Sequence, residues 1–222
     1  MGGARRPPSQ IGPRPRPCSI ADRPVCQPLR VRNPAIVLGA IALAAALVIG
    51  FVQAGGTTES KPGTRLSRAE VAKPIAGAPP PLAALRTRVS EIKTGGEKAF
   101  DAQLRALRGY PVVVNAWASW CDPCEFELPF FQRQAVQRGA KVAFVGLNVE
   151  DARPKARAMA ARYPLPYPTI ADPDRDIIER FRVRGLPVTI FFDADGNEQM
   201  VHQGVFPSEK DLSEAIDRYA LK

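Results

Sequence analysis

The order of apolar and polar residues from Leu82 onward predicts one domain of alternating helices and buried strands. Apolar residues recur at helical spacing in five segments: residues 97–107, 122–138, 151–163, 172–181 and 207–219. Two runs are apolar and β-branched at successive positions, as strands covered on both faces are: residues 111–117 and 141–149. Strands that alternate with helices in this way indicate a parallel sheet with crossover connections.

The segment 187–203 predicts a β-hairpin at the end of this domain. The turn sequence DADG, at 193–196, separates the apolar run 186–192 from a second strand in NEQMVHQG. An antiparallel hairpin joined to parallel strands makes a mixed sheet. We therefore predict an α/β domain over residues 82–222, with helices on both faces of a central mixed sheet.

The apolar run AIVLGAIALAAALVIGFV, residues 35–52, predicts a transmembrane helix. The Arg-rich residues 1–34 lack a periodic apolar pattern, which predicts a disordered cytoplasmic tail under the positive-inside rule. Residues 53–81 predict a Pro/Gly-rich tether that leads to an extracytoplasmic domain. We favour a retained anchor, and a signal peptide cleaved near Ala54 is the alternative.

The net charge of +9 does not predict a nucleic-acid-binding protein. Residues 1–34 hold seven arginines and one acid, so this tail accounts for +6 of the charge and leaves only +3 on the other 188 residues, which predicts no basic face on the domain. We therefore expect no nucleic-acid partner. We expect the protein to be a monomer. Cys18 and Cys26 lie in the tail, and we expect them to stay reduced.

The stretch WASWCDPCEFELP, residues 117–129, holds the candidate chemistry. It runs from the end of a predicted strand into a helix, which places Cys121 at the helix N-terminus and Cys124 one turn inside. Backbone amides and the helix dipole stabilise a thiolate at that end, so Cys121 is the predicted nucleophile. Cys124 is placed to resolve a mixed disulfide.

Metal binding and a structural disulfide are the alternatives for this cysteine pair. A zinc site needs two further ligands, and the predicted domain adds only His202, which we expect to be a solvent-facing strand residue. A permanent disulfide would close a loop of two residues and would constrain the unfolded chain little. Copper(I) held by the two thiolates and His202 stays open as a minor alternative.

The blocks LRGYP, VVVNAWASWCDPCEFELPFF and RVRGLPVTIFFDADGNE resemble the TlpA/ResA-like branch of membrane-anchored thioredoxin-fold proteins. The resemblance covers about residues 82–222 and implies a thioredoxin-like three-layer domain. It implies an extracytoplasmic thiol:disulfide oxidoreductase that needs no cofactor beyond the redox-active Cys121–Cys124 disulfide. Relatives often reduce apocytochrome c before haem attachment, so a role in cytochrome c biogenesis is implied too.

The resemblance also assigns roles to single residues. Cys121 matches the attacking cysteine and Cys124 the resolving one, while Leu186 and Pro187 match a cis-proline loop that binds the substrate chain. With Trp120, this loop is expected to form the substrate surface. Glu127 matches an acid near the thiols and is the candidate general acid and base, since Asn115, where cytosolic thioredoxins carry a buried aspartate, cannot accept a proton. Glu125 is expected to be a solvated helix acid.

Three acids beside the cysteine pair predict the direction of electron transfer. Asp122, Glu125 and Glu127 put negative charge near Cys121, which disfavours the thiolate and makes the dithiol a reductant. A reductant outside the cytoplasm needs an integral-membrane thiol donor, and its targets are expected to be cysteine-containing extracytoplasmic proteins. An extracytoplasmic oxidant and a copper(I)-binding assembly factor are the alternatives.

Overall fold

The computed structural model describes residues 64–221. The predicted tail 1–34, the predicted anchor 35–52, the first part of the predicted tether, and Cys18 and Cys26 lie outside the described residues. Within the described part of the chain, no helix has the length and apolar character needed to cross a bilayer.

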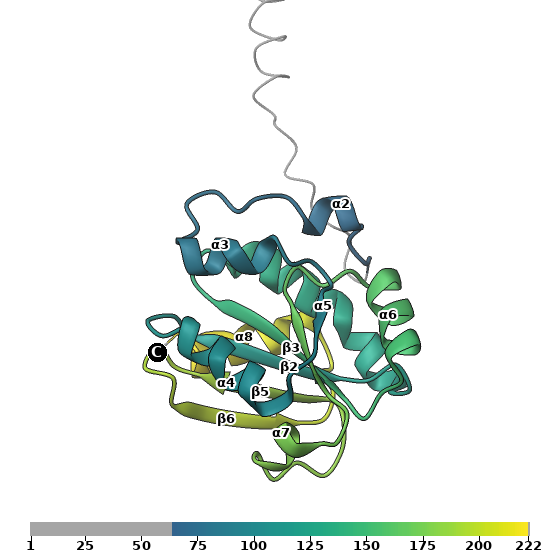
Figure 1. The fold of residues 1–222 in the computed structure, drawn as a ribbon. Coiled ribbons are helices and arrows are strands. Elements are labelled where there is room, and N and C mark those ends of the chain that lie inside the picture. The colour runs from purple at the N-terminus through teal and green to yellow at the C-terminus, as the bar shows by residue number, and fades with distance from the viewer. Residues whose placement is uncertain (1–63, 222) are drawn as a thin grey trace, which may run out of the picture. The chain divides into compact units, whose positions relative to one another are not determined.

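The described chain forms six strands and seven helices (Figure 1). The strands are β1 (Ile92–Lys93), β2 (Val112–Trp117), β3 (Ala143–Val149), β4 (Thr169–Asp172), β5 (Val188–Phe192) and β6 (Glu198–Gln203). The helices are α2 (Arg68–Val71), α3 (Pro80–Arg86), α4 (Gly96–Ala106), α5 (Asp122–Arg138), α6 (Arg153–Arg162), α7 (Asp176–Glu179) and α8 (Glu209–Tyr219). All the elements predicted from periodicity are present, with bounds that differ by a few residues.

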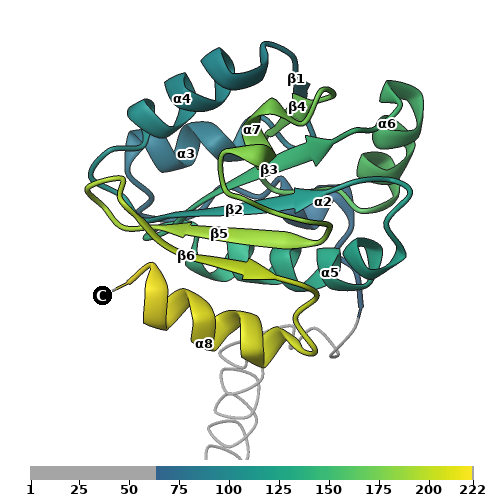
Figure 2. The same cartoon turned by 90° about the horizontal axis from the view of Figure 1, so that it is seen from below.

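The six strands form one mixed sheet in the order β1-β4-β3-β2-β5-β6. The first four of these are parallel, whereas β5 pairs with β2, and β6 with β5, in antiparallel fashion. This arrangement confirms the predicted mixed sheet with an antiparallel hairpin at one edge. Figure 2 shows the strands side by side, with β1 at one edge and β6 at the other.

Two buried clusters, one on each face of the sheet, make the core. One contains Val113 and Trp117 from β2 together with Phe131 of α5 and Ile216 of α8. The other contains alternate residues of β2, such as Val114, with side chains of α4 and α7. Because β2 and β3 are buried at every position, they have no polar face, which explains their unbroken apolar sequences.

Strand β4 lies in a segment that the sequence predicts to be a loop. Its four residues are too few for a period to be seen, and Pro168 precedes them. The strand packs tightly on β3, because the Thr169 side chain fills the space beside Gly146. A Cβ atom at Gly146 would lie 2.2 Å from Thr169 Oγ1, so only glycine allows this approach.

The packed domain begins before the predicted boundary at Leu82. Leu66 and Val71 are buried, although the composition of residues 53–81 predicts a tether. The Gln132 side chain on α5 accepts the Leu66 N–H at 2.9 Å and donates to the Leu66 carbonyl at 3.3 Å. Arg133 donates to the Thr64 carbonyl at 2.8 Å. These bonds join residues 64–71 to the helix that carries both cysteines.

Candidate active site

Cys121 and Cys124 form a disulfide at the N-terminus of α5. Cys121 is the N-cap residue, and its Sγ accepts the Cys124 N–H at 3.2 Å. In the reduced state this amide and the helix dipole favour a thiolate on Cys121. Only 4% of Cys121 and none of Cys124 is exposed, so the two sulfurs differ little in burial and mainly in their position on the helix.

The loop before β5 lies against the disulfide region. The Leu186–Pro187 peptide bond is cis, as the resemblance implies. Register pairing of Val188 with Ala116 sets this loop beside the end of β2, and the half-buried Leu186 packs on the cluster that contains both cysteines. Trp120 is 55% exposed and precedes Cys121, so an aromatic surface adjoins the disulfide.

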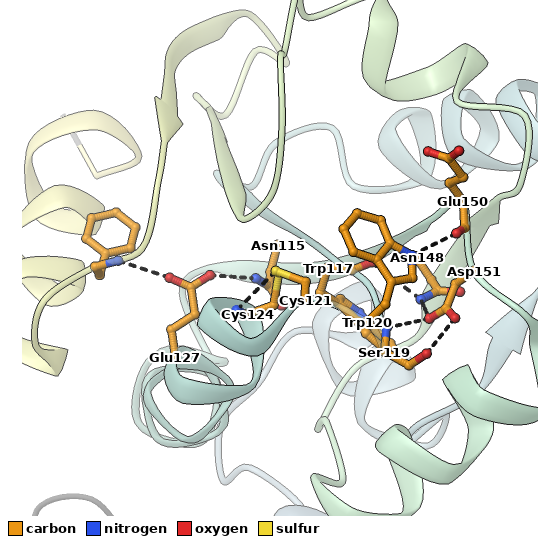
Figure 3. Close-up of a disulfide and its surroundings, with 11 residues drawn as sticks. Asn115, Trp117, Ser119, Trp120, Cys121, Cys124, Glu127, Asn148, Glu150 and Asp151 are labelled. Carbon is orange, nitrogen blue, oxygen red and sulfur yellow. Dashed lines mark hydrogen bonds between the residues drawn. A yellow bond between two sulfur atoms is a disulfide. The ribbon is translucent and has the colours of Figure 1, made fainter.

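A polar clamp holds the segment between β2 and α5 (Figure 3). The Asp151 carboxylate accepts the Ser119 N–H at 2.5 Å, the Ser119 hydroxyl at 2.6 Å and the Asn148 amide at 2.9 Å. The Trp120 indole N–H donates to the Glu150 carbonyl at 2.8 Å. The sequence analysis did not predict this clamp. The signal that could have shown it is that the carboxyl ends of neighbouring parallel strands meet at one edge of a sheet, where ligand-binding residues are frequently found.

Asp151→Ala is expected to raise the KM for a protein disulfide several-fold while the reduction potential changes little. The Ser119 amide and hydroxyl lose their acceptor, so the Trp120 surface is held less firmly, whereas the sulfurs keep their surroundings. Steady-state kinetics of Asp151→Ala, with Glu150→Gln as control, measures the effect. The control keeps the carbonyl that binds Trp120 and removes a charge whose partner is Arg175. Equal KM values for both variants would contradict the clamp.

Glu127 is fully buried and lies on α5 one turn after Cys124. Its Oε1 accepts the Asn115 amide at 3.4 Å, and its Oε2 accepts the Phe206 N–H at 3.0 Å. Burial raises the pKa of Glu127 to about 8, against the opposing effect of the Phe206 hydrogen bond. In Figure 3 the carboxyl group of Glu127 points toward the Asn115 amide. A carboxyl with this pKa takes up and releases protons near neutral pH.

The other two acids near the cysteines differ from each other. Glu125 is not a solvated acid, because Arg162 forms an ion pair with it and the Tyr163 hydroxyl donates to it at 2.8 Å. Burial, followed by this bond to Glu125, raises the pKa of Tyr163. Asp122, the first residue of α5, is exposed. The three acids therefore have three different surroundings, since Glu127 is buried, Glu125 is paired and Asp122 is exposed.

The prediction that His202 faces solvent is wrong. Its ring stacks on Phe206 with centroids 4.1 Å apart, and it is only partly exposed on β6. Burial lowers the pKa of His202, which favours the neutral imidazole. Among the residues that the structure describes, no three His, Cys, Asp or Glu side chains form a group that could hold a metal ion. His202 and the two cysteines are thus not assembled as a copper site.

Comparison with known proteins places this fold and site in a family. The redoxin family matches residues 87–216, which is more than half of the chain. The chain belongs to the redoxin family. This membership agrees with the thioredoxin-like fold and with the disulfide at the start of α5, and it confirms the ResA-like resemblance seen in the sequence.

Curated relatives of this redoxin-family chain are named as a thioredoxin-like protein, a thiol-disulfide oxidoreductase and a thiol:disulfide interchange protein. The thioredoxin-like protein YneN of Bacillus subtilis is 30% identical over 55% of this chain and 71% of its own length. The thiol-disulfide oxidoreductase ResA of Geobacillus kaustophilus is 26% identical over 50% of this chain and 65% of its own. The thiol:disulfide interchange protein DsbE of Allochromatium vinosum is 41% identical over 40% of this chain and 49% of its own.

Proposed function

We propose that this redoxin-family protein is a membrane-anchored, extracytoplasmic thiol:disulfide oxidoreductase that reduces disulfides in proteins. The observation that supports this most directly is the Cys121–Cys124 disulfide at a helix N-terminus, in a domain that also has a cis Leu186–Pro187 bond before β5 and a buried Glu127 carboxyl one turn after Cys124. The names of the relatives ResA and DsbE support the same class of reaction.

The proposed reaction begins with the reduced protein. The Cys121 thiolate attacks one sulfur of a substrate disulfide, the substrate S–S bond breaks, and the first substrate thiolate leaves. Cys124 then gives its proton to the Glu127 carboxylate and attacks the Cys121 sulfur of the mixed disulfide. The second substrate thiolate leaves, and both take protons from water. Two electrons pass to the substrate and the Cys121–Cys124 disulfide remains.

The substrate is proposed to lie across the surface made by Trp120, Leu186 and Pro187. Trp120 offers an exposed aromatic face beside Cys121, and the clamp at Asp151 and Glu150 holds it in place. An extended substrate chain can pair with backbone groups beside the cis-proline. Apocytochrome c, whose cysteines must be reduced before haem is attached, is the proposed target on the resemblance to this branch.

Burial at the site supports electron flow toward the substrate. The apolar surroundings of Cys121 disfavour its thiolate, although the Cys124 N–H favours it. A negative charge on Glu127 would add to this cost, and the exposed Asp122 lies next to Cys121. A dithiol whose thiolate is not strongly stabilised is a reductant. The apolar run 35–52 supports the anchored placement, which requires an integral-membrane thiol donor to renew the dithiol.

A measured reduction potential tests the direction of electron transfer. Equilibration with dithiothreitol is expected to give the full-length protein a reduction potential of about −270 mV, the value of a reducing thioredoxin. A strong oxidant would have a potential of about −120 mV. Asp122→Asn is expected to move the potential upward, because it removes an acid beside the nucleophile. The exposed Asp195→Asn, in the turn between β5 and β6 at the end of the sheet where β2 begins, serves as control. A potential near that of the strong oxidant would support the oxidant alternative instead.

A further inference from the structure

Three polar residues form a row across the sheet beside Glu127. Asn115 of β2 is the register partner of Thr189 of β5, and Thr189 is the partner of His202 of β6. Side chains of direct partners in adjacent strands lie on the same face of a sheet. Asn115 donates to Glu127, so this face is the one that α5 covers. The row therefore runs from the buried carboxyl to the edge strand.

The three members of this row carry buried polar atoms without a hydrogen-bond partner among the described residues: Asn115 Oδ1, Thr189 Oγ1 and His202 Nε2. Asn115 and Thr189 are each only 1% exposed. Buried polar atoms are nearly always satisfied by protein or by ordered water, so a row of such atoms is a polar path through an otherwise apolar layer.

His202 completes the path to the surface. It is the only histidine in the 222-residue chain, and it lies partly exposed on the strand at the sheet edge. Its ring stacks on Phe206, whose backbone N–H donates to Glu127. A neutral imidazole both accepts and donates a proton, whereas Asn115 and Thr189 can only position water between His202 and Glu127.

We propose that Asn115, Thr189 and His202, bridged by buried water, are the route by which Glu127 exchanges its proton with solvent. The inference rests on the proposed role of Glu127 as the proton acceptor of Cys124. In each turnover the proton from the Cys124 thiol reaches the Glu127 carboxylate, passes through the row to the imidazole and leaves to solvent. No electrons move along the row, so it sets the rate of proton release and leaves the redox equilibrium unchanged.

Turnover of the full-length protein with a protein disulfide and excess dithiothreitol tests the route, at low buffer concentration near neutral pH. Thr189→Val and His202→Phe are each expected to lower kcat about a hundredfold, the lower end of the range for loss of assisted proton transfer. Added imidazole is expected to restore kcat in His202→Phe, where it takes the place of the lost side chain. The reduction potential and the pKa of Glu127, followed by carbon NMR of the carboxyl, are expected to stay at their wild-type values.

Two control variants separate the route from general damage to the site. Thr189→Ser keeps the hydroxyl and is expected to turn over at the wild-type rate. Tyr167→Phe removes another buried hydroxyl without a partner, whose pKa is raised by burial and by the charge of Glu127, and which lies outside the row. It is expected to leave kcat unchanged. A slow Tyr167→Phe beside a fast Thr189→Val would overturn the row as the route.

Glu127→Gln distinguishes failure of the route from failure of the proposed function. If Glu127→Gln is slow while Thr189→Val and His202→Phe keep the wild-type kcat, the route is wrong and the role of Glu127 stands. If Glu127→Gln keeps the wild-type kcat, Glu127 is not the acceptor and the route falls with it. A slow His202→Phe that imidazole does not restore, with a changed potential, would assign His202 a structural role and overturn the proposal.

Discussion

Full-length protein carrying Cys124→Ala is expected to accumulate covalent complexes with its target proteins. Cys121 caps α5 and still attacks the substrate disulfide, but no second thiol is left to break the mixed disulfide that forms. Multiple turnover is expected to fall by roughly a thousandfold or more, as when one member of a catalytic unit is lost. Non-reducing gels and mass spectrometry of the complexes measure this, and they also identify the targets.

The matched control for this trap is Cys121→Ala, which is expected to form no complexes. Both variants are made in a chain whose Cys18 and Cys26 are replaced by serine, so that any trapped bond belongs to the site. Complexes that form with Cys121→Ala, and not with Cys124→Ala, would reverse the two assigned roles. Apocytochrome c among the targets would support the proposed substrate, and a set of trapped proteins without it would redirect the proposal to other cysteine-containing proteins.

Local sequence patterns predicted the parts of the fold that have strong periods or distinctive turns. The apolar runs of β2 and β3 and the turn before β6 are such signals, and the mixed sheet follows from their order. The strand β4 was not predicted, because four residues are too few to show an apolar period. Its stability comes from pairing with β3, which is distant in the sequence. The packing of residues 64–71 was not predicted, because their composition resembles that of a tether. The buried side chains of Leu66 and Val71 and a hydrogen bond to the distant Gln132 hold them in place.

The same division applies to the candidate site. The pair Cys121 and Cys124 is a local motif at a strand-to-helix junction, so the sequence alone placed it at the helix N-terminus. The surroundings of Glu127 are not local: Asn115 is 12 residues away and Phe206 is 79 residues away along the chain. Nothing near Glu127 in the sequence shows that it is fully buried. The misplacement of His202 has the same cause, since a loop after β6 brings Phe206 over its ring.

Glu127→Gln is expected to change how the stability of the oxidised protein depends on pH. The pKa of Glu127 is about 8 in the folded protein and near the ordinary glutamate value of 4.5 when unfolded, so the folded state holds the proton more tightly. This contribution to stability is fully present below pH 4.5 and is lost as the pH rises through 8. A shift of this size amounts to roughly 5 kcal/mol, taken as an upper bound.

Urea unfolding of the oxidised proteins at pH 5 and pH 9 measures this effect, because the disulfide keeps both cysteines from titrating. Between pH 5 and pH 9 the wild-type protein is expected to lose several kcal/mol of its free energy of unfolding. Glu127→Gln is expected not to show this loss, since glutamine carries no charge to bury. Asp172, whose pKa burial also raises, is present in both proteins and cancels in the comparison. Glu125→Gln is the control, because it removes only a partly exposed ion pair. Its change in the free energy of unfolding between pH 5 and pH 9 is expected to lie within about 1 kcal/mol of the wild-type change. Parallel pH curves for wild type and Glu127→Gln would mean that folding does not raise the pKa of Glu127, and a carboxylate with an ordinary pKa would be too weak a base for the proposed role as acceptor of the Cys124 proton.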